Sequence, residues 1–172
     1  MNRAGGHFNR TLVDNVAWID GLEFRIQRGY RYYLTADEGP FGEFIDIPDG
    51  FLTNFASTPR IAWAVFPPTG SYAQAAGGHD KLFLAPVIRT LHSARPCRFE
   101  ETPGLFRDMA KACGTSRIVR GAMYVFLQLG SRPAWDKYRA HDRLVGSTTT
   151  LEWASPTALV AFEANAVAER TA

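Results

Sequence analysis

Cysteine is scarce in this chain, and so is an excess of charge of either sign. The 172 residues include two cysteines, Cys97 and Cys113, and neither lies in a CxxC pair or at zinc-ligand spacing from a histidine. We therefore expect two free thiols, as in a reducing compartment. The formal net charge is only +2 and the basic residues are scattered, so we expect no nucleic-acid partner.

Long apolar runs are also missing. No run approaches the roughly 20 residues that a membrane-spanning helix needs, so we expect no membrane span. The first ten residues, MNRAGGHFNR, lack the apolar core of a secretory signal, which favours synthesis in the cytoplasm.

The residues that are present are typical of a soluble globular protein. Hydrophobic residues make up 46% and charged residues 21% of a chain whose length suits one domain. We predict a polar N-terminal arm over residues 1–20 and a single α+β domain over 21–145. Residues 146–172 are expected to form a linker and a C-terminal helix.

Alternating apolar and β-forming residues dominate the first third of the chain. The pattern predicts strands at 22–27, 30–36, 43–48 and 51–55, with the first two forming a hairpin. The PDG sequence at 48–50 predicts a turn. We therefore expect a small N-terminal antiparallel sheet.

Helical periodicity takes over after Ser57. The fold class predicted is α+β, with the small sheet followed by a helical bundle of about five to six helices. The helices are expected at 59–66, 71–85, 105–113, 117–130, 135–145 and 155–170. Residues 86–104 contain three prolines and are predicted to be a loop. Ser116 is predicted to cap the helix at 117–130. This segment is apolar on nearly every side after Arg120 and is predicted to be the most buried helix.

The stretch AAGGHDKLF at 75–83 carries the main catalytic candidates, His79 and Asp80. Helical spacing places His79 on the apolar face and Asp80 about 100° around the helix. Adjacent helical residues make a poor pair of metal ligands, so a buried structural histidine is the simpler interpretation. The later pair, His141 and Asp142, is expected on a solvated face.

A second group of polar residues lies where the last predicted strand leads into the first predicted helix. We expect Arg60 to form an ion pair with Asp80 or Asp46. The polar cluster predicted in this way comprises Thr53, Asn54, Ser57, Arg60, His79 and Asp80.

The segment from 47 to 83 resembles DUF1353, a family of phage and prophage proteins. The motifs that carry the resemblance are IPDGFLTNFASTPR, a tryptophan, PPTGSY and AAGGHDKLF. The likeness continues weakly through RGAMYVFLQLG, so it covers residues from roughly 20 to 130. The chain departs from the family pattern at Pro103, where an aspartate is expected, and at the two glycines before His79.

The resemblance implies a phage or prophage setting, often near tail and lysis genes, but no established activity. We expect a virion protein of a phage or a gene-transfer-agent-like particle, acting as a tail-associated structural or assembly component without a cofactor. Its partners would be other virion or tail proteins, with a homo-oligomer within the assembly left open. It would be synthesised in the host cytoplasm and located in the virion.

Two other functions stay open. One is a zinc-dependent peptidoglycan hydrolase centred on His79, with Asp80 and His92 as the other candidate ligands. The second is a cytoplasmic phage factor that binds a host protein.

Overall fold

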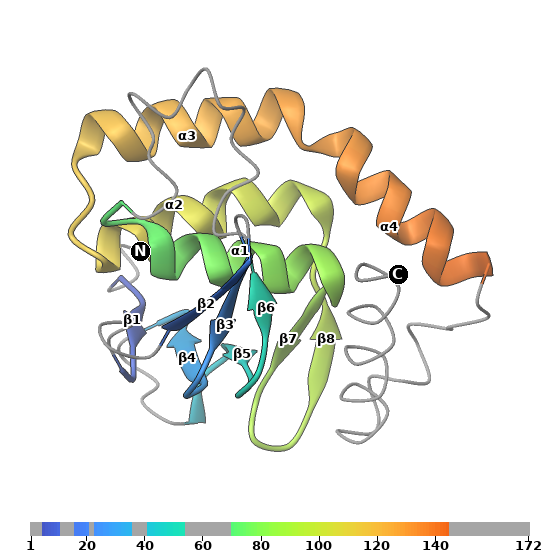
Figure 1. Cartoon of the computed structure of the whole chain (residues 1–172), viewed down its shortest axis with the longest axis horizontal. Coiled ribbons are helices and arrows are strands. Elements are labelled where there is room, and N and C mark those ends of the chain that lie inside the picture. The colour runs from blue at the N-terminus through green and yellow to red at the C-terminus, as the bar shows by residue number, and fades with distance from the viewer. Residues whose placement is uncertain (1–4, 11–15, 21–22, 36–40, 54–69, 145–172) are drawn as a thin grey trace.

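The computed structural model describes residues 5–10, 16–20, 23–35, 41–53 and 70–144. These residues form two antiparallel sheets and four α-helices, which confirms the predicted α+β class (Figure 1). The helices predicted at 59–66 and 155–170 lie outside the described residues, so the predicted total of five to six is matched only in part. None of the described helices combines the length and apolarity needed to cross a bilayer.

The larger sheet has five strands in the order β1-β4-β5-β7-β8, and every neighbouring pair is antiparallel. Its strands are β1 (His7–Phe8), β4 (Tyr30–Tyr33), β5 (Phe44–Ile47), β7 (Val87–Arg89) and β8 (Ala94–Pro96). Strands β7 and β8 follow the first helix along the chain, so the predicted order of sheet first and helices after is only partly correct.

The smaller sheet has the order β2-β3-β6 and contains β2 (Val16–Asp20), β3 (Glu23–Ile26) and β6 (Leu52–Thr53). The predicted PDG turn is present: Gly50 has a φ of +79° and donates its N–H to the carbonyl of Ile26 over 2.7 Å. This bond places β6 beside β3.

The predicted hairpin between 22–27 and 30–36 is wrong. Strand β3 pairs with β2 and β6, whereas β4 pairs with β1 and β5. The chain changes sheet near Gly29, whose N–H donates to the carboxylate of Asp49. A Cβ at this glycine would lie 2.5 Å from the carbonyl oxygen of Ile47, so no side chain fits there.

Two segments expected to be irregular contain strands. The predicted arm at 1–20 supplies β1 and β2, and the predicted loop at 86–104 contains β7, β8 and a short 3₁₀ helix, η3 (Phe99–Glu101). Prolines suggested a loop, but Pro96 ends an edge strand, where a missing N–H costs little. Arg95 of β8 binds Glu43 through both Nε and Nη2, which fastens the hairpin to the sheet.

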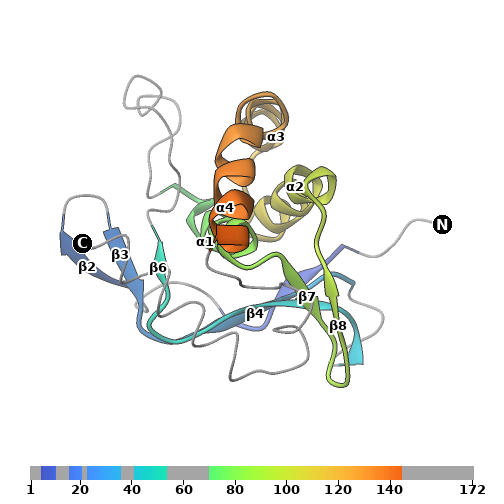
Figure 2. The same ribbon diagram turned by 90° about the vertical axis from the view of Figure 1, so that its right-hand side faces the viewer.

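The four helices lie on one side of the strands (Figures 1 and 2). They are α1 (Ala73–Leu84), α2 (Thr102–Ala112), α3 (Arg117–Gly130) and α4 (Arg132–Leu144). The predicted cap at Ser116 is confirmed, since its hydroxyl accepts the N–H of Val119. Gly114 ends the preceding helix with a φ of +76°.

The most buried helix is α1, not α3 as predicted. Ala75, Ala76, Gly77 and Gly78 give α1 a narrow surface, and a Cβ at Gly78 would lie 2.6 Å from Sδ of Met109 in α2. In α3 only Met123 is buried. The apolar pattern of α3 predicts burial on all sides, but α3 lies in the outer layer, with α1 and α2 between it and the strands (Figure 2).

Candidate functional site

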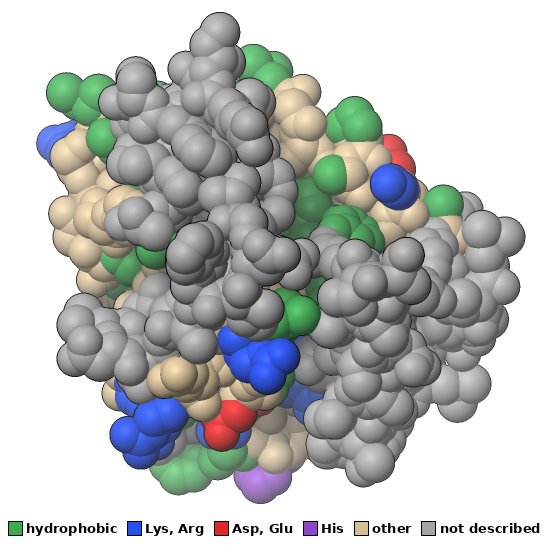
Figure 3. All heavy atoms as spheres, viewed as in Figure 1, with side chains coloured by type: hydrophobic (Ala, Val, Ile, Leu, Met, Phe, Trp, Pro, Cys, Tyr) green, Lys and Arg blue, Asp and Glu red, His purple; other side chains and the backbone are tan. Residues whose placement is uncertain are grey.

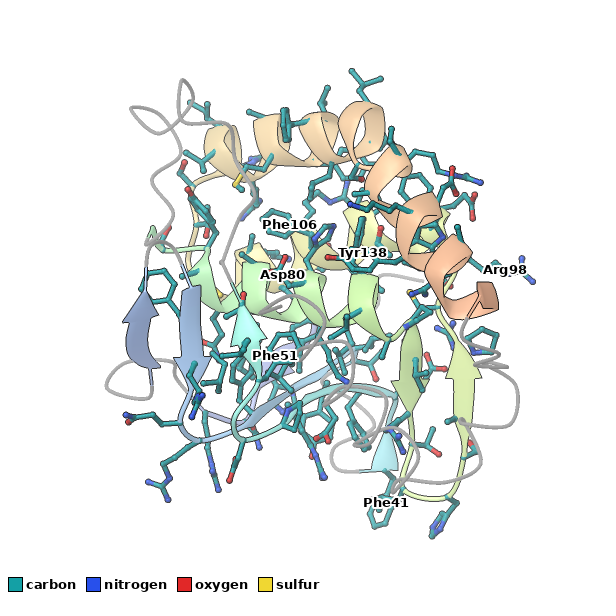
Figure 4. All side chains as sticks on the ribbon, turned by 45° about the vertical axis from the view of Figure 1, so that its right-hand side comes forward. Phe41, Phe51, Asp80, Arg98, Phe106 and Tyr138 are labelled. Carbon is teal, nitrogen blue, oxygen red and sulfur yellow. The ribbon has the colours of Figure 1, made fainter. Side chains whose placement is uncertain are left out.

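The centre of the candidate site is the contact between β6 and α1. The hydroxyl of Thr53 donates to Oδ2 of Asp80 over 2.6 Å. Thr53 is buried and Asp80 is half-buried, so the bond lies at the edge of the core. Figure 4 shows Asp80 on α1 and Phe51, which precedes β6, on the strand side of that helix. A hydrogen bond to an ionised carboxylate is among the stronger ones, so this contact fixes the end of β6 on α1.

Tyr30 of β4 lies in the core below the same helix. Its hydroxyl donates to the backbone carbonyl of Gln74 over 2.8 Å. Burial raises the pKa of Tyr30 well above its ordinary value, and the negative potential of Cys113 and Asp80 adds to the increase. The phenol is therefore a neutral hydrogen-bond donor at physiological pH and no base.

His79 lies in an aromatic environment. Its side chain is 8% exposed, its ring centroid is 4.4 Å from that of Phe83, and Phe106 meets it edge-on at 5.8 Å. Burial lowers the pKa of His79 to about 4, so the imidazole is neutral at pH 7. Among the residues that the structure describes, Nε2 has no hydrogen-bond partner.

His79 and Asp80 do not converge on one point. The histidine packs on Phe83 and on Phe106 of α2, whereas the aspartate bonds to Thr53 of β6. This divergence follows from the 100° step between neighbouring helical residues.

The third candidate zinc ligand, His92, lies in the turn between β7 and β8. This turn is exposed, and the N–H of His92 donates to the hydroxyl of Thr90. The described residues contain no group of three His, Cys, Asp or Glu side chains placed to hold a metal ion. The structure thus brings Thr53 and Asp80 together but does not assemble His79, Asp80 and His92.

Part of the predicted cluster cannot be placed. Asn54, Ser57 and Arg60 lie outside the described residues, as do the side chains of His141 and Asp142. The predicted pairing of Arg60 with Asp80 or Asp46 stays a prediction. Asp46 accepts from Nε of Arg31 over 2.7 Å.

Sequence reasoning missed the aromatic residues that extend the environment of His79. Trp135 of α4 is buried and meets Phe83 edge-on at 5.3 Å. Arg139 lies over the Trp135 ring, 5.0 Å from its centroid, and Nη2 donates to the carbonyls of Phe83 and Leu84. The spacing of Trp135 and Arg139, one helical turn apart, was the available signal.

Lys81 was also missed. It is 4% exposed on the helix that carries His79 and Asp80, and burial lowers its pKa to about 7. Asp46 opposes this decrease and Arg89 adds to it. The sequence offers little signal for this burial, because lysine is seldom placed in a core.

The contacts of the described side chains hold neighbouring helices and strands together. They resemble tertiary packing more than a reaction centre. A neutral histidine with a pKa of about 4 is a weak base at pH 7, and Asp80 is bonded to Thr53 and not to the imidazole. Among the residues that the structure describes, a nucleophile, a base and an orienting group do not line up as they do in a catalytic triad.

The family model described as "Protein of unknown function (DUF1353)" matches residues 24–127, from β3 to near the end of α3. No curated protein and no solved structure matches the chain. Because the family model spans more than half of the 172 residues, the chain belongs to the DUF1353 family.

Proposed function

We propose that the protein is a tail-associated virion component that binds a neighbouring virion protein through the outer face of α3. The observation that carries the proposal is a stripe of exposed apolar side chains on this helix. Ile118 is 85% exposed and Leu129 is 81% exposed, and Val125 and Phe126 lie between them along the helix. We call Ile118, Val125, Phe126 and Leu129 the α3 stripe.

The spacing of the α3 stripe suits one helical face. Its members follow Ile118 by seven, eight and eleven positions, which places them along one side of a helix. Val119, Met123 and Leu127 pack on the core instead. Green side chains along the upper edge of Figure 3, where α3 runs, belong to this outer layer. Several exposed apolar side chains on one face of an outer helix are typical of a protein-binding surface.

A partner helix or groove would bury these side chains as in other helix-in-groove complexes. The phage and prophage setting implied by the DUF1353 resemblance makes a neighbouring virion protein the expected partner. The His79 region supports a structural role, because its described contacts connect β6, α1, α2 and α4 and assemble no reaction centre.

The test is incorporation into particles of the phage or prophage that encodes the protein. Ile118→Ser and Leu129→Ser, combined in one chain, are expected to lower the amount of protein in purified particles at least about tenfold, because burial of two apolar side chains is lost. The matched control is Gln128→Ser, which changes an exposed polar residue of the same helix.

The double variant is expected to keep the unfolding midpoint of the parent, since both side chains are exposed. Normal incorporation of the double variant, or absence of the parent protein from particles, would overturn the proposal. If the parent protein is absent from particles and captures a host protein, the alternative of a cytoplasmic phage factor would be favoured.

The zinc hydrolase is tested separately. Elemental analysis of the purified protein is combined with a cell-wall lysis assay of the parent and of His79→Ala. Stoichiometric zinc and loss of lysis in His79→Ala would replace the structural proposal. A metal-free parent without lytic activity, with His79→Ala changed only in stability, would remove the hydrolase.

A further inference from the structure

A cavity lies between the N-terminal segment, β4 and α2, and none of the residues of the α3 stripe lines it. Its volume is about 470 Å³, which is within the range of sites for small molecules. Gly5 and Gly6 form one edge, Tyr32 and Leu34 belong to the strand side, and Leu105 lies on the helix side. The DUF1353 motifs around His79 take no part in it.

The strand side of the cavity carries a polar group whose hydrogen bond is unmet. Tyr32 is 1% exposed, and among the described residues its buried hydroxyl has no hydrogen-bond partner. The hydroxyl lies directly beneath Gly6, where a Cβ would overlap it. Buried hydroxyl groups are normally paired. Gly6 covers this one, so a bound molecule reaches it only where the Gly5–Gly6 edge shifts.

The helix side carries two opposite charges, Asp108 and Lys111, which are one turn apart and both line the cavity. A Cβ at Gly5 would lie 3.6 Å from Nζ of Lys111, so the ammonium group is at the glycine edge. Within the described part of the chain Lys111 has no ion-pair partner, and Asp108 has only a long contact of 3.7 Å with exposed Arg107.

We propose that this cavity binds a free α-amino acid with an aliphatic side chain. The ammonium of Lys111 and the hydroxyl of Tyr32 hold the carboxylate, and the carboxylate of Asp108 holds the amino group. The side chain of the ligand packs between Leu34 and Leu105. A single charge on the ligand would leave either Asp108 or Lys111 unpaired, so a zwitterion fits better than a simple acid or amine.

The test is calorimetric and NMR titration of the full chain with aliphatic amino acids, with leucine as the first probe. Two analogues of leucine test the contribution of each charged group. The first, 4-methylpentanoate, lacks the amino group, and the second, 3-methylbutylamine, lacks the carboxylate. Leucine or a close aliphatic relative is expected to bind saturably, and each analogue is expected to bind at least about tenfold more weakly.

Variants locate the site. Lys111→Met and Asp108→Asn change exposed side chains and are each expected to weaken binding about tenfold or more without shifting the unfolding midpoint. Tyr32→Phe is expected to weaken binding by a smaller factor. The matched control is Lys137→Met, an exposed lysine of α4 that does not line the cavity.

Three results would overturn the proposal. They are the absence of saturable binding for every aliphatic amino acid up to about 10 mM, equal binding of an analogue that lacks one charge, and unchanged affinity in both Lys111→Met and Asp108→Asn. None of these results depends on the α3 stripe or on incorporation into particles.

Discussion

The hydroxyl of Thr53 and the carboxylate of Asp80 are 2.6 Å apart, although 27 positions separate the two residues along the chain. The bond closes a long segment between the smaller sheet and α1. A strand as short as β6 has few backbone hydrogen bonds of its own, so this side-chain contact is an important anchor.

Replacing Thr53 by valine should destabilise the protein. The change keeps the shape of the side chain but removes the donor to Asp80, and the expected loss in the free energy of unfolding is about 1–2 kcal/mol because the carboxylate is half-buried. Urea unfolding of both proteins measures the difference. The matched control is Thr35→Val. Its buried hydroxyl has no partner among the described residues, so the expected change is under about 0.5 kcal/mol. Equal losses in the two variants would contradict the importance of the Thr53–Asp80 bond.

His79 should make the protein sensitive to acid. Burial lowers its pKa to about 4 from an ordinary 6.5, so the unfolded chain binds more protons between these values. The free energy of unfolding is therefore highest above pH 6.5 and should fall by about 3 kcal/mol as the pH decreases to 4. His79→Leu should remove this decrease and change stability at pH 7 by less than about 1 kcal/mol. Urea unfolding at several pH values checks both expectations. His92→Leu, a change in an exposed turn, is the control and should keep the acid sensitivity of the parent.

Lys81 should make the free energy of unfolding depend on pH in the alkaline range, above pH 7. Burial lowers its pKa to about 7 from 10.5, so the unfolded chain again binds more protons between the two values. Stability should therefore rise with pH above 7, by up to about 1.4 kcal/mol per unit. The window to measure is pH 7 to 8.5, because the buried thiols with raised pKa values begin to act in the opposite direction near pH 9. Lys81→Met should flatten the profile, whereas Lys137→Met should leave it unchanged. A flat profile in the parent would contradict the burial of a neutral lysine.

Arg139, which is half-buried on α4, should contribute substantially to stability. Its Nη2 caps the last carbonyls of α1, and its guanidinium lies over Trp135. Arg139→Met should lower the free energy of unfolding by about 2 kcal/mol, because two charge-assisted hydrogen bonds and the ring contact are lost. Arg132→Met is the matched control: Arg132 also lies over a ring, that of Phe99, but it is more than half exposed. Its expected effect is about 0.5 kcal/mol or less. Thermal unfolding of the two variants separates these values.

Local features of the fold were predictable from the sequence because they depend on neighbouring residues. The helix Arg117–Gly130 and its cap at Ser116 agree with the prediction, as do the turn at Gly50 and the position of α1. These features depend on capping, periodicity and backbone freedom, all of which act over a few positions.

Strand pairing and layer order were not predictable in the same way. Adjacent strands β3 and β4 belong to different sheets, and nothing in either segment encodes its partner. The α3 segment is apolar enough to be a core helix, but α1 is central because its alanines and glycines admit close neighbours.

The sequence predicted some of the residues of the candidate site, but it predicted less of how they are arranged. Thr53 and Asp80 were expected in one cluster, and they are in contact. The sequence shows that Trp135 and Arg139 are one helical turn apart, but not that they meet the end of α1, because that contact depends on how a distant helix crosses it.

The borders of the five-stranded sheet have a consequence for behaviour at high concentration. Within the described part of the chain the sheet ends in β1, with two residues, and in β8, with three residues. Strand β8 also contains Pro96, which has no N–H to offer, and the charged side chain of Arg95. Such short and interrupted borders give an incoming extended chain little to pair with, so this sheet resists amyloid-like growth at its edges.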